Sequence, residues 1–108
     1  MRRSLQKLIE NVAKAKSQNV KALAYYRLGL FHDNNGREAE AIPNYLKAIK
    51  LGLANELEAK ARAWLASSLY KIGRPKSASK QQKLSLTLTH NPKLHQFLLG
   101  LEKRVRNG

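Results

Sequence analysis

Residues 28–41 read LGLFHDNNGREAEA, and residues 65–78 read LASSLYKIGRPKSA. Both stretches begin with leucine and a small residue, carry glycine at the ninth place and end with alanine. The two glycines, Gly36 and Gly73, are 37 residues apart. Self-similarity at a spacing of this size is typical of arrays of helical units. The two stretches therefore predict a repeated helical hairpin that turns at each glycine.

The small residues give a physical reason for this spacing. Two antiparallel helices approach closely only where both present small side chains at the contact. We therefore expect Gly29 to lie opposite Ala41, and Ala66 to lie opposite Ala78. Gly36 can take the left-handed backbone conformation in which many helices end.

The rest of the chain has the same helical character. Apolar residues recur at spacings of three and four almost throughout, and no long stretch alternates with period two as a strand would. The expected fold class is all-α, with about six helices that form antiparallel hairpins in an α-solenoid. We expect these helices near 4–17, 20–34, 37–51, 55–73, 75–89 and 92–107.

A chain of 108 residues has room for one domain, so 1–108 is expected to be a single domain. Its expected parts are an N-terminal helix in 1–18, a first repeat at 20–52, a second repeat at 55–89, and a C-terminal helix at 92–107 that resembles the start of a third repeat.

Several helix ends can be predicted from single residues. Ser4 is a candidate cap of the first helix, and Asn55 opens a capping-box pattern with a glutamate three places on. Asn91 followed by Pro92 predicts the start of the last helix. Pro43 falls inside the third helix, where proline is costly, so we expect that helix to begin late or to bend there.

At these positions the chain resembles the tetratricopeptide repeat. The first unit matches the motif of that family at Leu28, Gly29, Gly36, Ala41, Tyr45 and Ala48. The second unit matches at Leu65, Ala66, Gly73 and Ala78, and departs from the motif at Arg62, Gln82 and Ser85. The resemblance covers about residues 20–108. It implies a right-handed array of helical hairpins, and is fairly specific for fold and nearly silent on function.

The resemblance also implies a surface for a partner, because the family holds extended peptides on the inner face of the first helices of its repeats. Transferred by position, that groove consists of Leu23, Tyr26, Arg27, Leu30, Asn34, Lys60, Ala63, Ser67, Tyr70, Lys71, Leu94, Phe97 and Leu101. Tyr26 and Leu30 stand where the members that grip a C-terminal carboxylate have lysine and asparagine, so a carboxylate clamp is rejected. The expected groove is largely apolar with basic edges.

This groove admits three interpretations. It binds a peptide or a helix of a partner protein, which is the leading hypothesis. Alternatively, the N-terminal helix covers it, or a second copy of the chain covers it in a homodimer, since monomers rarely leave a large apolar patch exposed. Trp64 lies on one stripe with Ala61 and Leu65, so packing in the core is preferred for it over a role as a binding anchor.

Charge suggests a different partner. The chain has 21 Lys and Arg against 7 Asp and Glu, and residues 59–108 contain one acidic residue, Glu102. Such a surface attracts polyanions, so non-specific binding of nucleic acid is the alternative function. A second interpretation of the charge is that it only keeps the protein soluble. The residues that would contact phosphates are Arg74, Lys76, Lys80, Lys83, Lys93, Lys103, Arg104 and Arg106.

Other classes of function are disfavoured by composition. There is no cysteine, no glycine-rich phosphate loop, and the three histidines are too scattered for a recognisable metal site, so we expect no enzyme, no cofactor and no metal. No apolar run approaches a membrane span, and polar residues interrupt the start of the chain where a signal peptide would be apolar. A cytoplasmic location without membrane contact is therefore expected.

Overall fold

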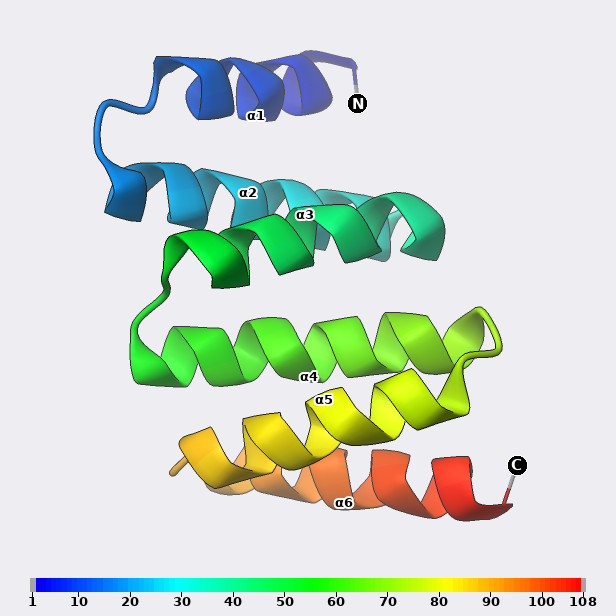
Figure 1. Cartoon of the computed structure of the whole chain (residues 1–108). Coiled ribbons are helices and arrows are strands. Elements are labelled where there is room, and N and C mark those ends of the chain that lie inside the picture. Colours follow the sequence, from blue (N-terminus) through cyan, green and yellow to red (C-terminus); the bar gives the residue numbers. More distant parts are fainter. Residues whose placement is uncertain (1, 108) are drawn as a thin grey trace. The chain divides into compact units, whose positions relative to one another are not determined.

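The computed structural model describes residues 2–107, and within this range it contains six α-helices and no strand (Figure 1). This confirms the predicted all-α class. The contacts divide the chain into two compact units, Met1–Leu53 and Ala54–Gly108, and each unit is described by itself. None of the helices in the described range is long and apolar enough to cross a membrane.

Unit 1 consists of α1 (Arg2–Lys14), α2 (Gln18–Asn34) and α3 (Glu38–Leu51). Consecutive helices run antiparallel, as Figure 1 shows. The turn between α2 and α3 contains Gly36 at φ 71°, so the predicted left-handed glycine is confirmed. The amide of Arg37 returns to the carbonyl of His32 in this turn, which satisfies one of the carbonyls left open at the end of a helix.

The α2–α3 contact is built around Tyr45, whose side chain is fully buried. A Cβ placed on Gly29 would lie 2.7 Å from two atoms of the Tyr45 ring, so the small residue at this position allows the ring to approach α2 closely. Tyr26 packs on the same ring with a centroid separation of 6.2 Å. The Tyr45 hydroxyl donates to Asp33 Oδ2 at 2.9 Å, and burial, followed by the nearby Asp33 charge, raises the pKa of Tyr45.

Unit 2 consists of α4 (Asn55–Lys71), α5 (Pro75–Leu88) and α6 (Pro92–Asn107). Its first turn repeats that of unit 1: Gly73 has φ 83°, and the amide of Arg74 returns to the carbonyl of Leu69. The core brings α4 and α6 together through Ala59, Ala63, Leu94 and Leu98, with Trp64, Leu86, Leu88 and Phe97 packed around them.

The two departures from the repeat motif in α5 have a structural role. Gln82 stands where unit 1 has Tyr45, and its buried amide donates to the backbone carbonyl of Leu98 on α6 at 3.2 Å. Ser85 stands where unit 1 has Ala48, and its buried hydroxyl donates to the carbonyl of Ala59 on α4 at 2.6 Å. Polar residues at these places therefore tie α5 to both of its neighbours.

The predicted helix starts are partly corrected. Asn91 caps α6 as expected, since its Oδ1 accepts from the amide of Leu94 at 3.1 Å. Ser4 lies inside α1, which already includes Arg2, so it does not cap that helix. A serine cap is found at the next helix, where Ser17 precedes α2 and its Oγ accepts from the amide of Val20.

Asn55 does not cap α4 either, because it is the first residue of that helix. The capping position is Ala54, which makes no side-chain hydrogen bond to the helix. The glutamate of the capping-box pattern, Glu58, instead accepts from Arg62 Nε at 2.8 Å. Glu56 accepts from the amide of His90 and the hydroxyl of Thr89. Its side chain is therefore engaged with the connection between α5 and α6.

Pro43 lies within α3, which starts at Glu38, so the expected late start is wrong. Glu38 and Glu40 in the first turn favour an early start because they complement the positive end of the helix dipole. Asn44 donates from its side-chain amide to the carbonyl of Glu40 at 2.9 Å, which gives that carbonyl a partner beside the proline.

Candidate functional site

The predicted groove residues differ widely in exposure. Tyr26, Ala63, Leu94 and Leu101 are buried, and at least Tyr26, Ala63 and Leu94 pack inside their own unit. Leu23, Leu30, Ser67, Tyr70 and Phe97 are half-buried, whereas Arg27, Asn34, Lys60 and Lys71 are exposed. Two clefts, each within one unit, contain some of these residues.

The cleft of unit 2, here called the aromatic cleft, has a volume of about 240 Å³. It lies between α4 and α6 and is lined by Lys60, Trp64, Asn91, Lys93, Leu94 and Phe97. Trp64 and Phe97 meet edge to face, with ring centroids 5.2 Å apart and ring planes at 65°. Trp64 thus packs against the core, as expected, and also forms part of the cleft wall.

The edges of the aromatic cleft are basic. Lys60 and Lys93 are exposed, and no acidic residue is among those that line the cleft. The carboxylate of Glu56 lies near Lys60, but it is engaged by the amide of His90 and the hydroxyl of Thr89. The bond from His90 is the main reason that the pKa of Glu56 is lowered. An apolar side chain flanked by carboxylates would complement this cleft.

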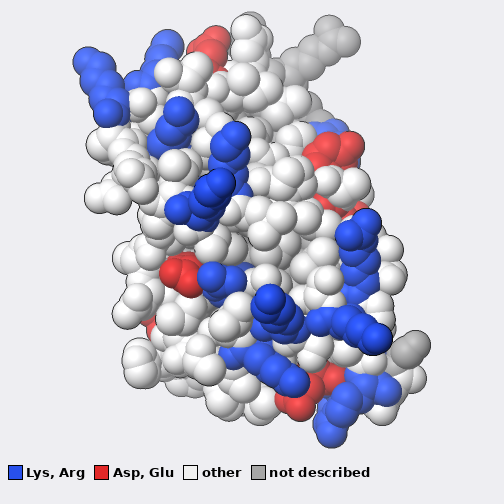
Figure 2. Space-filling view, viewed as in Figure 1, with Lys and Arg blue, Asp and Glu red and all other residues white. Residues whose placement is uncertain are grey.

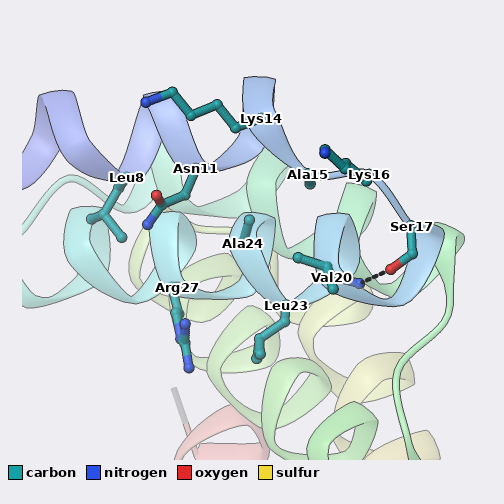
Figure 3. A pocket seen from close by; sticks show the side chains of 10 residues that line it. All are labelled: Leu8, Asn11, Lys14, Ala15, Lys16, Ser17, Val20, Leu23, Ala24 and Arg27. Atoms are coloured by element: carbon teal, nitrogen blue, oxygen red, sulfur yellow. Dashed lines mark hydrogen bonds between the residues drawn. The ribbon is translucent and has the colours of Figure 1, made fainter.

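The cleft of unit 1, here called the α1–α2 cleft, has a volume of about 420 Å³. Figure 3 shows its lining residues: Leu8, Asn11, Lys14, Ala15, Lys16, Ser17, Val20, Leu23, Ala24 and Arg27. Leu8 and Asn11 point from α1 toward α2 in this view. Leu23 and Arg27 were predicted as groove residues. Leu8, Asn11 and Lys14 of α1 were not among the predicted groove residues, although the N-terminal helix was one of the covers considered for that groove.

The eight predicted polyanion contacts are all exposed and all belong to unit 2. Figure 2 shows basic side chains scattered over one face of the molecule, where they clearly outnumber acidic ones. An ion pair within unit 2 joins Arg62 Nε to Glu58 at 2.8 Å and involves none of the eight.

The described residues contain no group of three or more potential metal ligands. His32 has a structural role, because its Nδ1 accepts from Arg37 Nε at 3.2 Å in the α2–α3 turn. Burial, together with the positive charge of Arg37, lowers the pKa of His32. No carboxylate is among the residues that line either cleft.

Comparison with known proteins gives one match. A family model described as "Tetratrico peptide repeat" matches residues 21–95, which span α2 to the start of α6. No curated protein and no solved structure matches the chain. The matched range includes both glycine turns and both small-residue positions from which the repeat was deduced.

Proposed function

This chain belongs to the tetratricopeptide repeat family, whose members generally mediate protein–protein interaction, and we propose that it binds a segment of a partner protein in the aromatic cleft. The family is typically non-enzymatic. The proposal is most strongly supported by one observation: an aromatic wall of Trp64 and Phe97 shares its cleft with two exposed lysines, Lys60 and Lys93.

The chemistry of this cleft specifies the kind of segment that fits. Tryptophan is enriched among the residues that contribute most to binding, because it offers a large apolar surface when water is excluded. A leucine or aromatic side chain of the partner would bury against Trp64 and Phe97. Carboxylates near it in the segment would face Lys60 and Lys93, which favours encounter and the correct register. The expected ligand is therefore a short acidic segment with an apolar anchor.

Trp64 provides a direct test, because it is the single tryptophan of the chain. Peptides with one leucine or phenylalanine between glutamates are titrated while Trp64 emission is followed. The double variant Lys60→Glu/Lys93→Glu should weaken binding by tenfold or more, an effect on the order of 1.4 kcal/mol. The matched control is Lys76→Glu/Lys83→Glu, which changes the charge equally at exposed positions of α5. Equal losses in both variants would mean general charge attraction and contradict a role of the cleft.

Binding of polyanions such as nucleic acid is a second candidate function. It is favoured by the exposure of the eight basic residues of unit 2. Contacts to phosphate release counterions and give affinity without sequence preference. The aromatic rings of this unit include Trp64 and Phe97, which meet edge to face, so no row of aromatic side chains spaced for stacking on successive bases supports single-strand recognition.

A further inference from the structure

The α1–α2 cleft has a counterpart inside unit 2, where the same position is filled. In both units a helix pair is joined by a short connection, residues 15–17 or 89–91, that ends in a polar cap. Ser17 accepts from the amide three residues on, and Asn91 does the same. The α1–α2 pair and the α5–α6 pair can therefore be aligned on these two caps.

The aligned positions of α2 and α6 differ in exposure, most strongly at the third and tenth residues after the cap. The third, sixth, seventh and tenth residues after each cap are Val20, Leu23, Ala24 and Arg27 in α2, and Leu94, Phe97, Leu98 and Leu101 in α6. In α6, Leu94 and Leu98 pack on Ala59 and Ala63 of α4, and Phe97 packs on Trp64. In α2 all four residues line the α1–α2 cleft. Leu94 is 5% exposed, whereas the aligned Val20 is 55% exposed.

The aligned positions of α1 and α5 agree with this. The ninth, sixth and second residues before each cap are Leu8, Asn11 and Ala15 in unit 1, and Gln82, Ser85 and Thr89 in unit 2. The last three are buried, and two of them bond to α4, Ser85 to the carbonyl of Ala59 and Thr89 to Glu56. The first three line the α1–α2 cleft. Both walls of the cleft thus include positions that in unit 2 contact α4, whereas Gln82, which is aligned with Leu8, bonds to α6.

We infer that the α1–α2 cleft is an open helix position that receives an acidic amphipathic helix from a partner protein. The position matches that of α4 against α5 and α6, so its occupant is a helix with an apolar stripe. This interaction is separate from the proposed ligand of the aromatic cleft, because it uses other residues in the other unit.

The charge of the cleft specifies an acidic occupant. Lys14, Lys16 and Arg27 line the cleft and are exposed, and no acidic residue is among its lining. The aligned residues of unit 2 are Leu88, His90 and Leu101, so the open position is more basic than the filled one. Glutamates beside the apolar stripe of an incoming helix would pair with these cations and favour its approach.

A second copy of this chain fits less well. None of the six helices has more acidic than basic residues, and the whole chain has a formal net charge of +14. Five of the helices have more basic than acidic residues, and placing one of these in a cleft with a basic rim would bring like charges together, which disfavours the contact. In α3 the two kinds are equal in number, so it brings no excess of negative charge to the cleft. The basic charge of the chain therefore favours a different protein as the source of the helix.

The test uses two synthetic peptides of about 18 residues, a length at which helices are only marginal alone and can form on binding. Both have leucine at i, i+3, i+4 and i+7, with glutamate at the flanking positions of one and lysine at those of the other. Binding to the full chain is measured by fluorescence anisotropy at low salt. The glutamate peptide should bind at least about tenfold more tightly than the lysine peptide.

Two variants locate the binding. Val20→Asp puts a charge on the cleft wall near the start of α2, where an acidic residue is compatible with the helix dipole, and should weaken glutamate-peptide binding at least about tenfold. Leu46→Asp is the matched control, because Leu46 is 48% exposed on α3 outside the cleft. It should leave binding unchanged, as should Lys60→Glu/Lys93→Glu, which tests the aromatic cleft separately. Circular dichroism confirms that each variant is folded.

Three results would overturn the inference. Equal binding of the two peptides would remove the charge argument, and equal losses from Val20→Asp and Leu46→Asp would remove the location. Self-association of the wild-type chain that Val20→Asp abolishes, measured by analytical ultracentrifugation, would show that a second copy occupies the position.

Discussion

Gly29 and Gly100 are both glycines inside helices, yet they have different surroundings. A Cβ on Gly29 would lie 2.7 Å from Cδ1 and Cε1 of the buried Tyr45 ring, whereas a Cβ on Gly100 would meet nothing within 4 Å. We expect Gly29→Ala to lower the free energy of unfolding by about 1–3 kcal/mol, because the α2–α3 contact must open. Gly100→Ala should raise it by about 0.5–1 kcal/mol, because alanine suits a helix better than glycine.

Urea denaturation of the two glycine variants beside wild type measures both effects. The chemical change is the same in both variants, so opposite changes in the free energy of unfolding would reflect the different surroundings of the two glycines. A stabilising Gly29→Ala would contradict the packing of Tyr45 on α2. Loss of stability from Gly100→Ala would show that something contacts this exposed face of α6.

At the level of elements, α3 contains a proline in its interior, where proline destabilises a helix. Pro43 is exposed and lies well after the start of α3 at Glu38, so it removes a backbone hydrogen bond from the helix. Pro43→Ala should raise the free energy of unfolding by about 1–3 kcal/mol. Pro75 at the start of α5 is the control, where the same change should lower it by up to about 1 kcal/mol. Thermal melts of both variants measure these changes in stability. A destabilising Pro43→Ala would contradict the view that Pro43 weakens α3.

The start of α4 is joined to the α5–α6 connection through Glu56, which makes this element contact sensitive to pH. Its pKa lies below the ordinary value of 4.5, mainly because the amide of His90 donates to the carboxylate. The resulting stabilisation is complete above that ordinary value and is lost as the pH falls through the lowered pKa. Glu56→Gln should therefore reduce the loss of stability between pH 6 and about pH 3.

Melting temperatures across this pH range measure the effect of Glu56→Gln. Glu10→Gln, at an exposed position of α1, serves as the control. If Glu56→Gln and wild type lose stability in parallel on acidification, the ionised carboxylate is not what holds the connection.

At the scale of the whole molecule, the positive charge should produce weak binding of nucleic acid that salt removes. If about five of the basic side chains contact one backbone, the logarithm of affinity falls with the logarithm of salt at a slope of −4 to −5. Replacing Lys76, Lys80 and Lys83 by glutamine should flatten this slope by up to about 2.7. Replacing Lys21, Lys47 and Lys50, which are exposed in unit 1, tests whether position matters.

A labelled oligonucleotide titrated at several salt concentrations provides these slopes. Sequence-selective binding that persists at high salt would contradict the expectation, because phosphate contacts alone do not select a sequence. It would also make nucleic acid the primary partner in place of protein.

The sequence by itself determined the helical class, the six helices and the repeat. These features are local: apolar spacing sets the helix period, and Gly36 and Gly73 turn because glycine tolerates positive φ. The cap at Asn91 was predictable for the same reason, since its partner is the amide of Leu94 in the next turn. Family membership rests on the same repeated positions.

Only the tertiary structure decided which residues meet. Gly29 meets Tyr45, Glu56 serves the connection at His90, and Trp64 meets Phe97 across two helices. Periodicity reports that a side chain faces a neighbour, but the identity of the neighbour depends on how distant helices pack. Of the predicted groove, Tyr26, Ala63 and Leu101 are buried, and some other residues belong to two clefts. Leu23 and Arg27 lie with residues of α1 in one cleft, and Lys60, Leu94 and Phe97 lie with Trp64 in the other. The remaining groove residues line neither cleft: Leu30, Asn34, Ser67, Tyr70 and Lys71.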